Sequence, residues 1–186
     1  MRLFAERGVA AVSVRDIAEA AGVSSSLVIH HYKSKEGLKA AVDERATEAL
    51  IGVVAELADS GPLDAASESL AAKFAAKLDA EPVLPAYIRR ILVDGGPVAG
   101  ALFQTLFEGT IQTMDGLEQA GVVRPADDEP ARAAFLMVSD LAVIILRAQI
   151  AGVLGIDPLS KDGVTRWTNT VMELYSQALF TPEAGA

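Results

Sequence analysis

The stretch of sequence that decides the fold reads Ser13-Val14-Arg15-Asp16-Ile17-Ala18-Glu19-Ala20-Ala21-Gly22-Val23-Ser24. Ser13 is followed three residues later by Asp16, which is the pattern of a capping box, so we expect a helix to begin at this serine. Gly22 can adopt the left-handed backbone conformation that ends a helix, and Ser24 can cap the next one. Two short helices joined by so tight a turn need a small residue where their axes approach, and Ala18 supplies it. The stretch therefore predicts a helix-turn-helix.

The apolar residues predict how these two helices pack. On the first helix, Ile17, Ala18 and Ala21 form an inward stripe. Val23 is expected to enter the core after the turn, and Val28 is expected to be the apolar plug of the second helix.

Three consecutive apolar residues, Leu27, Val28 and Ile29, stand in the second helix. At about 100° per residue they span about 200°, which is wider than one buried stripe, so at least one of them faces outward. Helix amides and hydroxyls at the exposed amino end suit phosphates and base edges. Spacing alone leaves two interpretations open: a DNA-binding face, and the ordinary polar surface of a small helical bundle. The residues of this face are Ser24, Ser25, Ser26, Ile29, His30 and His31, with Lys35 as a cation near the same surface.

The composition limits the classes of protein. The chain has 186 residues, of which 51% are hydrophobic and 22% charged, so we expect one or two compact units with a sizeable core. The absence of cysteine excludes a disulfide framework, thiolate metal sites and a cysteine nucleophile. The net charge is -9, and residues 1–48 hold as many basic as acidic residues, so the excess of acid lies in residues 49–186. Any contact with DNA must therefore be local and geometric.

Hydrophobic periodicity predicts the fold class. Apolar residues recur at three- and four-residue spacings and alternating β-branched runs are absent, so we expect an all-α fold. Residues 1–48 are expected to form a short three-helix unit with the helix-turn-helix, and residues 49–186 a larger helical bundle. A helix over residues 35–58 belongs to both. The apolar stretch 133–150 is interrupted by Asp140, Arg147 and Gln149, so it predicts a buried bundle helix rather than a membrane span.

Catalytic and cofactor chemistry finds little support in the sequence. His30 and His31 are adjacent, so their side chains point about 100° apart and do not chelate one ion as an i, i+4 pair does. Neither a nucleophile-elbow pattern nor a phosphate-binding glycine loop occurs. We therefore expect no enzyme activity, no metal and no cofactor. Glu6 interrupts any signal-like apolar stretch near Met1, so we expect a cytoplasmic protein with no membrane partner.

The quoted stretch, followed by His31-Tyr32-Lys33-Ser34-Lys35-Glu36-Gly37-Leu38, closely resembles the DNA-binding domain of TetR-type transcriptional regulators. The upstream Leu3-Phe4-Ala5-Glu6-Arg7-Gly8 is similar to the end of that family's first helix. The resemblance covers about the first 45 residues, and its signature is long and ordered. It implies a helical effector-binding and dimerisation domain in the rest of the chain. The family's first helix begins further upstream, so either the native start lies upstream of Met1 or the first helix here is truncated.

The resemblance also implies roles for individual positions. Family members grip the DNA backbone at positions that match Ser13, Val14, Leu27, His31 and Lys35. They read bases at positions that match Arg15, Ser25, Ser26 and Ile29. The family often has Gly-Thr-Leu-Tyr where this chain has Ser26-Leu27-Val28-Ile29, so a hydroxyl and a phenol are lost. Base reading is therefore expected to rely on Arg15 to guanine and on contact of Leu27 or Ile29 with thymine methyls.

Two helices of the larger domain are expected to form a dimer interface. The helix from about residue 128 to about residue 152 is apolar on nearly every side and must be buried all round. The last helix repeats apolar residues at helical spacing. Packing both against a second copy gives a two-fold four-helix bundle, as the resemblance implies, and a larger monomeric core is the alternative. The expected interface residues are Phe135, Leu141, Ile145, Trp167, Val171, Leu174 and Tyr175.

A ligand pocket is expected between the segments 84–94 and 98–119, which mix aromatic, apolar and a few polar residues. A cavity there suits a mostly apolar ligand held by one or two hydrogen bonds, and a plain core is the alternative. Charges beside apolar stretches, at Glu108, Asp140 and Arg147, are costly unless paired, so they bind ligand or form ion pairs. The candidate ligand-binding residues are Tyr87, Phe103, Gln104, Phe107, Glu108, Met114, Met137 and Asp140.

Together with the resemblance, these features predict a ligand-responsive transcriptional regulator, more specifically a repressor released from a pseudo-palindromic operator by a mostly apolar small molecule. Its expected partners are double-stranded operator DNA, that effector and a second copy of the chain. A helical ligand carrier or protein-interaction module that has lost DNA binding is the alternative from another class. The triplet at residues 27–29, the balanced charge of residues 1–48 and the truncated first helix favour this alternative. A third possibility is a regulator that answers to a protein partner.

Overall fold

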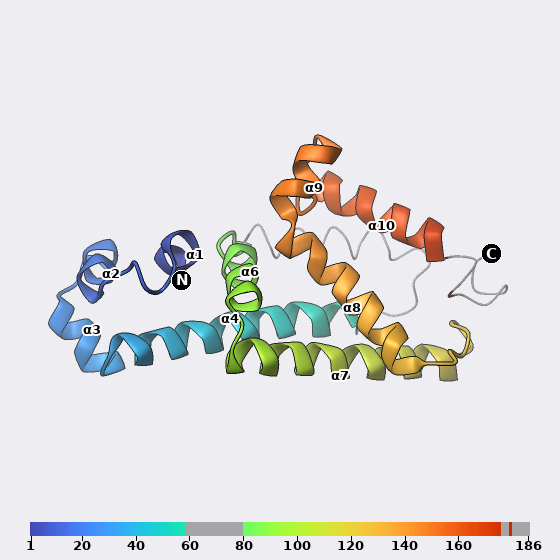
Figure 1. Ribbon diagram of the computed structural model, residues 1–186, viewed down its shortest axis with the longest axis horizontal. Coiled ribbons are helices and arrows are strands. Elements are labelled where there is room, and N and C mark those ends of the chain that lie inside the picture. The colour runs from blue at the N-terminus through green and yellow to red at the C-terminus, as the bar shows by residue number, and fades with distance from the viewer. Residues whose placement is uncertain (59–79, 176–178, 180–186) are drawn as a thin grey trace.

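The computed structural model describes residues 1–58, 80–175 and 179, and all the regular elements within these residues are helices (Figure 1). The expected all-α fold is confirmed. In chain order the helices are α1 (Arg2–Arg7), α2 (Val14–Ala21), α3 (Ser25–Tyr32), α4 (Lys35–Ala58), α6 (Leu84–Asp94), α7 (Pro97–Gln119), α8 (Glu129–Ile145), α9 (Arg147–Leu154) and α10 (Lys161–Tyr175).

The three short helices α1 to α3 lie at one end of the long helix α4 (Figure 1). α2 packs on α3, and α3 packs on α4. Gly22 ends α2 in the left-handed conformation, with φ at 67°. The turn closes because the amides of Gly22 and Val23 donate to the carbonyls of Glu19 and Ala18 at 3.1 and 2.9 Å. The predicted helix-turn-helix is therefore present.

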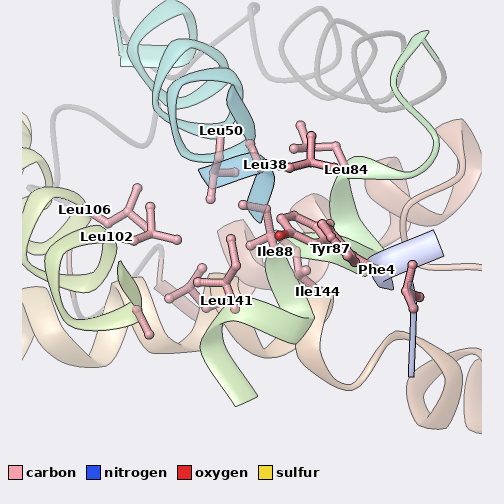
Figure 2. Close-up of a cluster of buried hydrophobic side chains, with 14 of the residues drawn as sticks. Phe4, Leu38, Leu50, Leu84, Tyr87, Ile88, Leu102, Leu106, Leu141 and Ile144 are labelled. Carbon is pink, nitrogen blue, oxygen red and sulfur yellow. The ribbon is translucent and has the colours of Figure 1, made fainter. Parts of the chain in front are cut away.

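One hydrophobic core joins the short helices to the larger part of the chain (Figure 2). α6 stands at its centre and packs on α1, α4, α7 and α8. α1 and α4 thus contribute to the same core as α8. The core side chains labelled in Figure 2 are Phe4, Leu38, Leu50, Leu84, Tyr87, Ile88, Leu102, Leu106, Leu141 and Ile144.

The expected continuous helix over about residues 128–152 is wrong. Its start is as predicted, since the Asp128 carboxylate accepts a hydrogen bond from the Ala131 amide at 3.0 Å. The helix breaks at Leu146, however, and α9 continues at 79° to α8. At the break the Arg89 Nε donates to the Ile145 carbonyl at 2.9 Å, which supplies a partner at a helix end where the last carbonyls lack an intrahelical donor.

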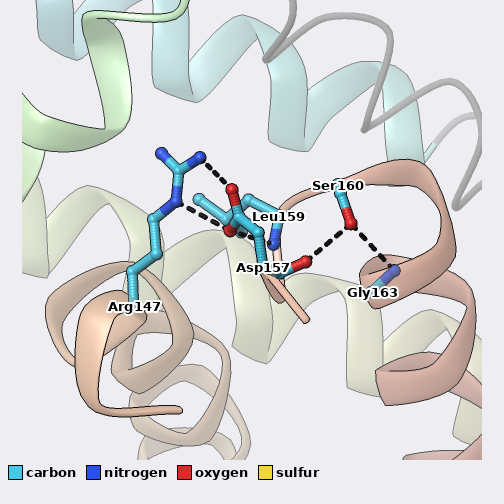
Figure 3. A network of polar contacts seen from close by, with 5 residues as sticks. All are labelled: Arg147, Asp157, Leu159, Ser160 and Gly163. Atoms are coloured by element: carbon cyan, nitrogen blue, oxygen red, sulfur yellow. Dashed lines mark hydrogen bonds and ion pairs between the residues drawn. The ribbon is translucent and has the colours of Figure 1, made fainter. Parts of the chain in front are cut away.

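A polar network fixes the chain between α9 and α10 (Figure 3). Arg147 makes a two-pronged ion pair with Asp157, in which its Nε and Nη2 lie 2.8 and 2.5 Å from the two carboxylate oxygens. Asp157 also accepts from the Leu159 amide, and its carbonyl accepts from the Ser160 hydroxyl. Arg147 was expected either to bind ligand or to form an ion pair, and the structure shows an ion pair.

Within the described ranges, no single helix has both the length and the apolar character needed to cross a membrane. Only α8 and α9 taken together, as a bent pair, meet those two criteria.

Candidate DNA-binding face and ligand site

The start of α2 is held by a complete capping box. The Asp16 amide donates to the Ser13 Oγ at 3.2 Å, and the Ser13 amide donates to the Asp16 carboxylate at 2.7 Å. The Ser13 hydroxyl also donates to that carboxylate, and these hydrogen bonds lower the pKa of Asp16 from its usual value. Both donors of Ser13 are thus used by Asp16, so the box positions the neighbouring Arg15 rather than leaving Ser13 a donor for phosphate.

The three consecutive apolar residues of α3, Leu27, Val28 and Ile29, point partly into the core and partly toward solvent. The Ser24 Oγ accepts from the Leu27 amide at 3.1 Å and caps the helix as predicted. Val28 is 6% exposed and enters the core, whereas Leu27 and Ile29 are 43% and 40% exposed. The expectation that part of the triplet faces outward is confirmed, and α3 offers apolar atoms to whatever it contacts.

Two residues near the turn do not lie where the periodicity placed them. Val23 and Ala21 are exposed. The Val23 amide closes the turn on the Ala18 carbonyl, and this leaves the Val23 side chain outside. Ala18 itself is buried as predicted, where α2 meets its neighbours.

The other residues expected to contact DNA share one end of the molecule with α2 and α3. Val14 and Lys35 are half-buried. The exposed members are Arg15, Ser25, Ser26, His30 and His31, together with the capping residues Ser13 and Ser24 and the apolar Leu27 and Ile29.

Tyr32, which was not among the residues expected to contact DNA, is exposed at the end of α3 with its ring centroid 6.4 Å from that of His31. The next residue, Lys33, has a positive φ of 67° and its Nζ donates to the His30 carbonyl at 2.8 Å. Tyr32 adds a phenol donor to the same face. In the sequence, Tyr32 could have been noticed as an aromatic residue among the polar residues His30, His31, Lys33 and Ser34.

A hollow of about 610 Å³ lies between α4 and α7. Its wall is made of small and aliphatic side chains, with two carboxylates and two hydroxyls among them. Apolar surface with a few polar groups is typical of small-molecule sites. The lining residues are Gly37, Ala40, Ala41, Asp43, Glu44, Thr47, Ile51, Val98, Ala101, Leu102 and Thr105.

None of the expected ligand-binding residues lines this hollow. Tyr87 and Met137 are buried in the core, and Phe107 packs against it. Glu108 is exposed and accepts a hydrogen bond from the Gln104 Nε2 at 2.8 Å. The remaining members of that set are Phe103, which is exposed, Met114, which is half-buried, and Asp140.

Asp140 keeps contact with solvent, yet the protein around it removes enough water to raise the pKa of its carboxyl to about 6. An unfolded aspartate titrates near about 4, so the folded protein binds more protons between pH about 4 and 6 and loses stability as the pH rises through that window. The solvent contact limits the size of this loss.

We therefore expect Asp140→Asn to gain stability relative to the wild type as the pH rises from about 4 to about 6. Urea unfolding of both proteins at several pH values measures this difference. An equal pH dependence of the two free energies of unfolding contradicts it.

The residues expected at a dimer interface fall into two groups. Phe135 and Leu174 are exposed, at 63% and 67%. Leu141 is instead buried in the chain's own core and Ile145 packs against it, because both share the face of α8 that carries Met137. On α10, Val171 and Tyr175 are half-buried, and Trp167 packs against the buried pair of Val143 and Leu159.

Within residues 1–58 and 80–175, no three His, Asp or Glu side chains gather as a metal site would require. The candidate functional sites are therefore the exposed face of the helix-turn-helix and the hollow between α4 and α7.

Comparison with known proteins agrees with this geometry. A family described as "Bacterial regulatory proteins, tetR family" matches residues 1–42. A second one, described as "Tetracyclin repressor-like, C-terminal domain", matches residues 79–181, which is more than half of the chain. The chain belongs to the TetR family.

The relatives of this TetR-family chain are transcriptional regulators by name. The regulatory protein RaaS of Mycobacterium tuberculosis is 35% identical over 140 residues, and the match covers 75% of this chain and 63% of RaaS. The repressor KstR2 of Rhodococcus jostii is 44% identical over 59 residues, 32% of this chain and 29% of KstR2. The matches thus span less than two thirds of these relatives.

The fold of the TetR-family chain is shared with solved structures. A γ-butyrolactone receptor superposes with a TM-score of 0.70 at 21% sequence identity, covering 99% of this chain and 85% of that one.

Proposed function

We propose that this TetR-family chain is a ligand-responsive DNA-binding regulator, and that it acts as a repressor. Residues 1–48 serve as the DNA-binding unit and residues 49–186 as the effector-binding and dimerisation domain. The observation that carries the proposal is the geometry of α3. Its inward residue Val28 is anchored in the core, while its capped amino end, with Leu27 and Ile29, faces solvent.

The proposed DNA face reads bases and contacts phosphates with different residues. Arg15 extends from the first turn of α2 toward guanine, and Ile29 contacts thymine methyl groups. Ser25 and Ser26 at the start of α3 also read bases, whereas His31 and Lys35 contact phosphates. KstR2, a relative by sequence, is named as a repressor, and this supports repression rather than activation.

The regulator acts as a homodimer through the outward faces of α8 and α10. Phe135 and Val138 lie on one side of α8 and are exposed, as are Leu146 directly after α8 and Leu174 on α10. Large apolar side chains exposed on neighbouring turns of a helix are typical of an interface between subunits.

We expect Phe135→Glu to shift the chain from dimer to monomer, because it places a charge in the proposed apolar interface. Sedimentation velocity at several protein concentrations measures the change. Val93→Glu is the matched control, since Val93 is 60% exposed but lies on α6, which is not part of the proposed interface. A dimer that survives Phe135→Glu, or is lost equally in the control, contradicts this interface.

A small, mostly apolar effector binds in the hollow between α4 and α7. Seven of its lining residues belong to α4, the helix that supports α3: Gly37, Ala40, Ala41, Asp43, Glu44, Thr47 and Ile51. A ligand there alters the position of α4 and thereby of α3. If the effector binds the conformation that does not bind DNA a hundredfold more tightly than the one that does, the coupling free energy between effector binding and DNA binding is about 2.7 kcal/mol. The γ-butyrolactone receptor, whose name states a small-molecule ligand, supports an effector of this size class.

The proposal is tested by selecting genomic fragments with the purified chain and then titrating salt on the fragment with the highest affinity. We expect a pseudo-palindrome, two subunits bound, and an affinity that falls steeply with salt. Recovery of no selective fragment would contradict the DNA-binding proposal and favour the helical ligand carrier.

A further inference from the structure

A buried polar contact links the DNA-binding unit to the rest of the chain. Among the described residues, Asp43 of α4 is the charged residue that is buried, with 4% of its surface exposed. The Tyr87 hydroxyl of α6, whose residue is 1% exposed, donates to the Asp43 Oδ1 at 2.7 Å. The other carboxylate oxygen is paired with Lys39, one helical turn earlier in α4.

Tyr87 belongs to α6, which packs on α1, α4, α7 and α8. Two residues further on, Arg89 donates to the Ile145 carbonyl, where α8 gives way to α9. The guanidinium of Arg90 lies against Gly8, so closely that a Cβ at position 8 would come within 2.2 Å of its Nη2. Gly8 is the C-cap of α1, and a cation is favourable at that end of a helix. α6 thus contacts α1, α4 and α8 through three neighbouring side chains.

The Tyr87–Asp43 hydrogen bond differs in kind from the apolar contacts around it. Apolar packing is non-directional, whereas a hydrogen bond to a carboxylate fixes both distance and angle. A buried carboxylate that loses a donor keeps the full cost of its desolvation, so the pair resists separation. Burial and the neighbouring carboxylate raise the pKa of Tyr87 well above its usual value, so its hydroxyl remains a donor at every working pH.

The Tyr87–Asp43 contact lies close to the end of α4 that carries α3. α3 packs on the start of α4, and Asp43 lies eight residues after Lys35, or about 12 Å at 1.5 Å per residue. A rotation of about 10° about this point moves α3 by about 2 Å. In a two-fold dimer the two movements add to about 4 Å, which exceeds the rise of one base pair.

We propose that Tyr87 is a positioning residue for operator choice: its hydrogen bond to Asp43 fixes the angle of α4 and thereby the half-site spacing that the dimer accepts. This inference rests on the proposed function, because it requires a dimer that binds a pseudo-palindrome. It assigns to Tyr87 a role in DNA selectivity without any contact with DNA.

The test compares the binding of wild type and Tyr87→Phe to the selected operator and to versions with one base pair inserted or deleted at its centre. We expect the wild type to prefer the native spacing, and Tyr87→Phe to lower that preference about tenfold, which is the effect available from one hydrogen bond to a charged group. Affinity for a single half-site stays unchanged. Lys39→Met is the matched control, because it also removes a partner of Asp43 but one that lies within α4.

The control separates positioning from a general weakening of the buried contact. Lys39→Met is expected to keep the wild-type spacing preference. Should Tyr87→Phe fail to fold, the double variant Tyr87→Phe/Asp43→Asn removes the hydroxyl without leaving a buried charge short of a donor, and it is expected to show the same loss of preference. An unchanged spacing profile in the Tyr87 variants, or an equal loss in Lys39→Met, overturns the inference alone. A wild type that binds no palindrome overturns the proposed function and the inference with it.

Discussion

Replacing Arg15 with alanine is expected to weaken binding to the selected operator and to flatten the base preference at one position of each half-site. A well-placed arginine–guanine contact contributes about 1–3 kcal/mol, so the affinity should fall by about 10- to 100-fold per contact. Arg15 is exposed in the first turn of α2, directly beside the capping box that fixes the helix start. Binding to a panel of operators with single base substitutions measures both effects.

Lys35→Ala provides the contrast on the same face. A phosphate contact carries no base information, so its loss should weaken all sequences alike and lower the salt slope by about one unit. Equal behaviour of the two variants, or an unchanged affinity in both, would show that the DNA face has been assigned to the wrong residues.

Gly37→Ala is expected to destabilise the protein by about 1–3 kcal/mol and to weaken DNA binding further. A Cβ at position 37 would lie 2.1 Å from the backbone carbonyl oxygen of Tyr32, at the end of α3. Because the obstacle is backbone, α4 must move away from α3. The Gly37 amide also donates to the Ser34 Oγ, a cap that such a movement disturbs.

Gly52→Ala is the matched control in the same helix. No atom lies within 4 Å of a Cβ at position 52, so this change should stabilise α4 by about 0.5–1 kcal/mol. Urea unfolding of the two variants is therefore expected to give shifts of opposite sign. A Gly37→Ala protein as stable as the wild type would contradict the close packing of α3 on α4.

The features that the sequence predicted correctly depend on residues that lie close together in the sequence. Ser13, Gly22 and Ser24 act on amides and carbonyls within a few residues of themselves, so the caps and the turn of the helix-turn-helix were predictable, although the burial of Ala21 and Val23 was not. The same holds for α6, whose bounds at Leu84 and Asp94 follow from flanking proline and glycine residues.

The features that could not be predicted depend on partners distant in sequence. The break between α8 and α9 involves Arg89, which is 56 residues away from the carbonyl it contacts. Tyr87 was expected to line a ligand pocket, but Asp43, 44 residues away, holds its hydroxyl in the core. Leu141 was expected at a dimer interface because α8 is apolar on most sides, and periodicity does not say which side meets the chain's own core.

The most direct test of the account is hydroxyl-radical footprinting of the purified chain on its selected operator. Two α3 helices in successive major grooves predict two protected patches on one face of the DNA, about 34–36 Å apart from centre to centre, and Arg15→Ala should raise the protein concentration needed to protect both. Protection that is uniform along the fragment, or that persists unchanged without Arg15, would contradict the claim that α2 and α3 read DNA sequence.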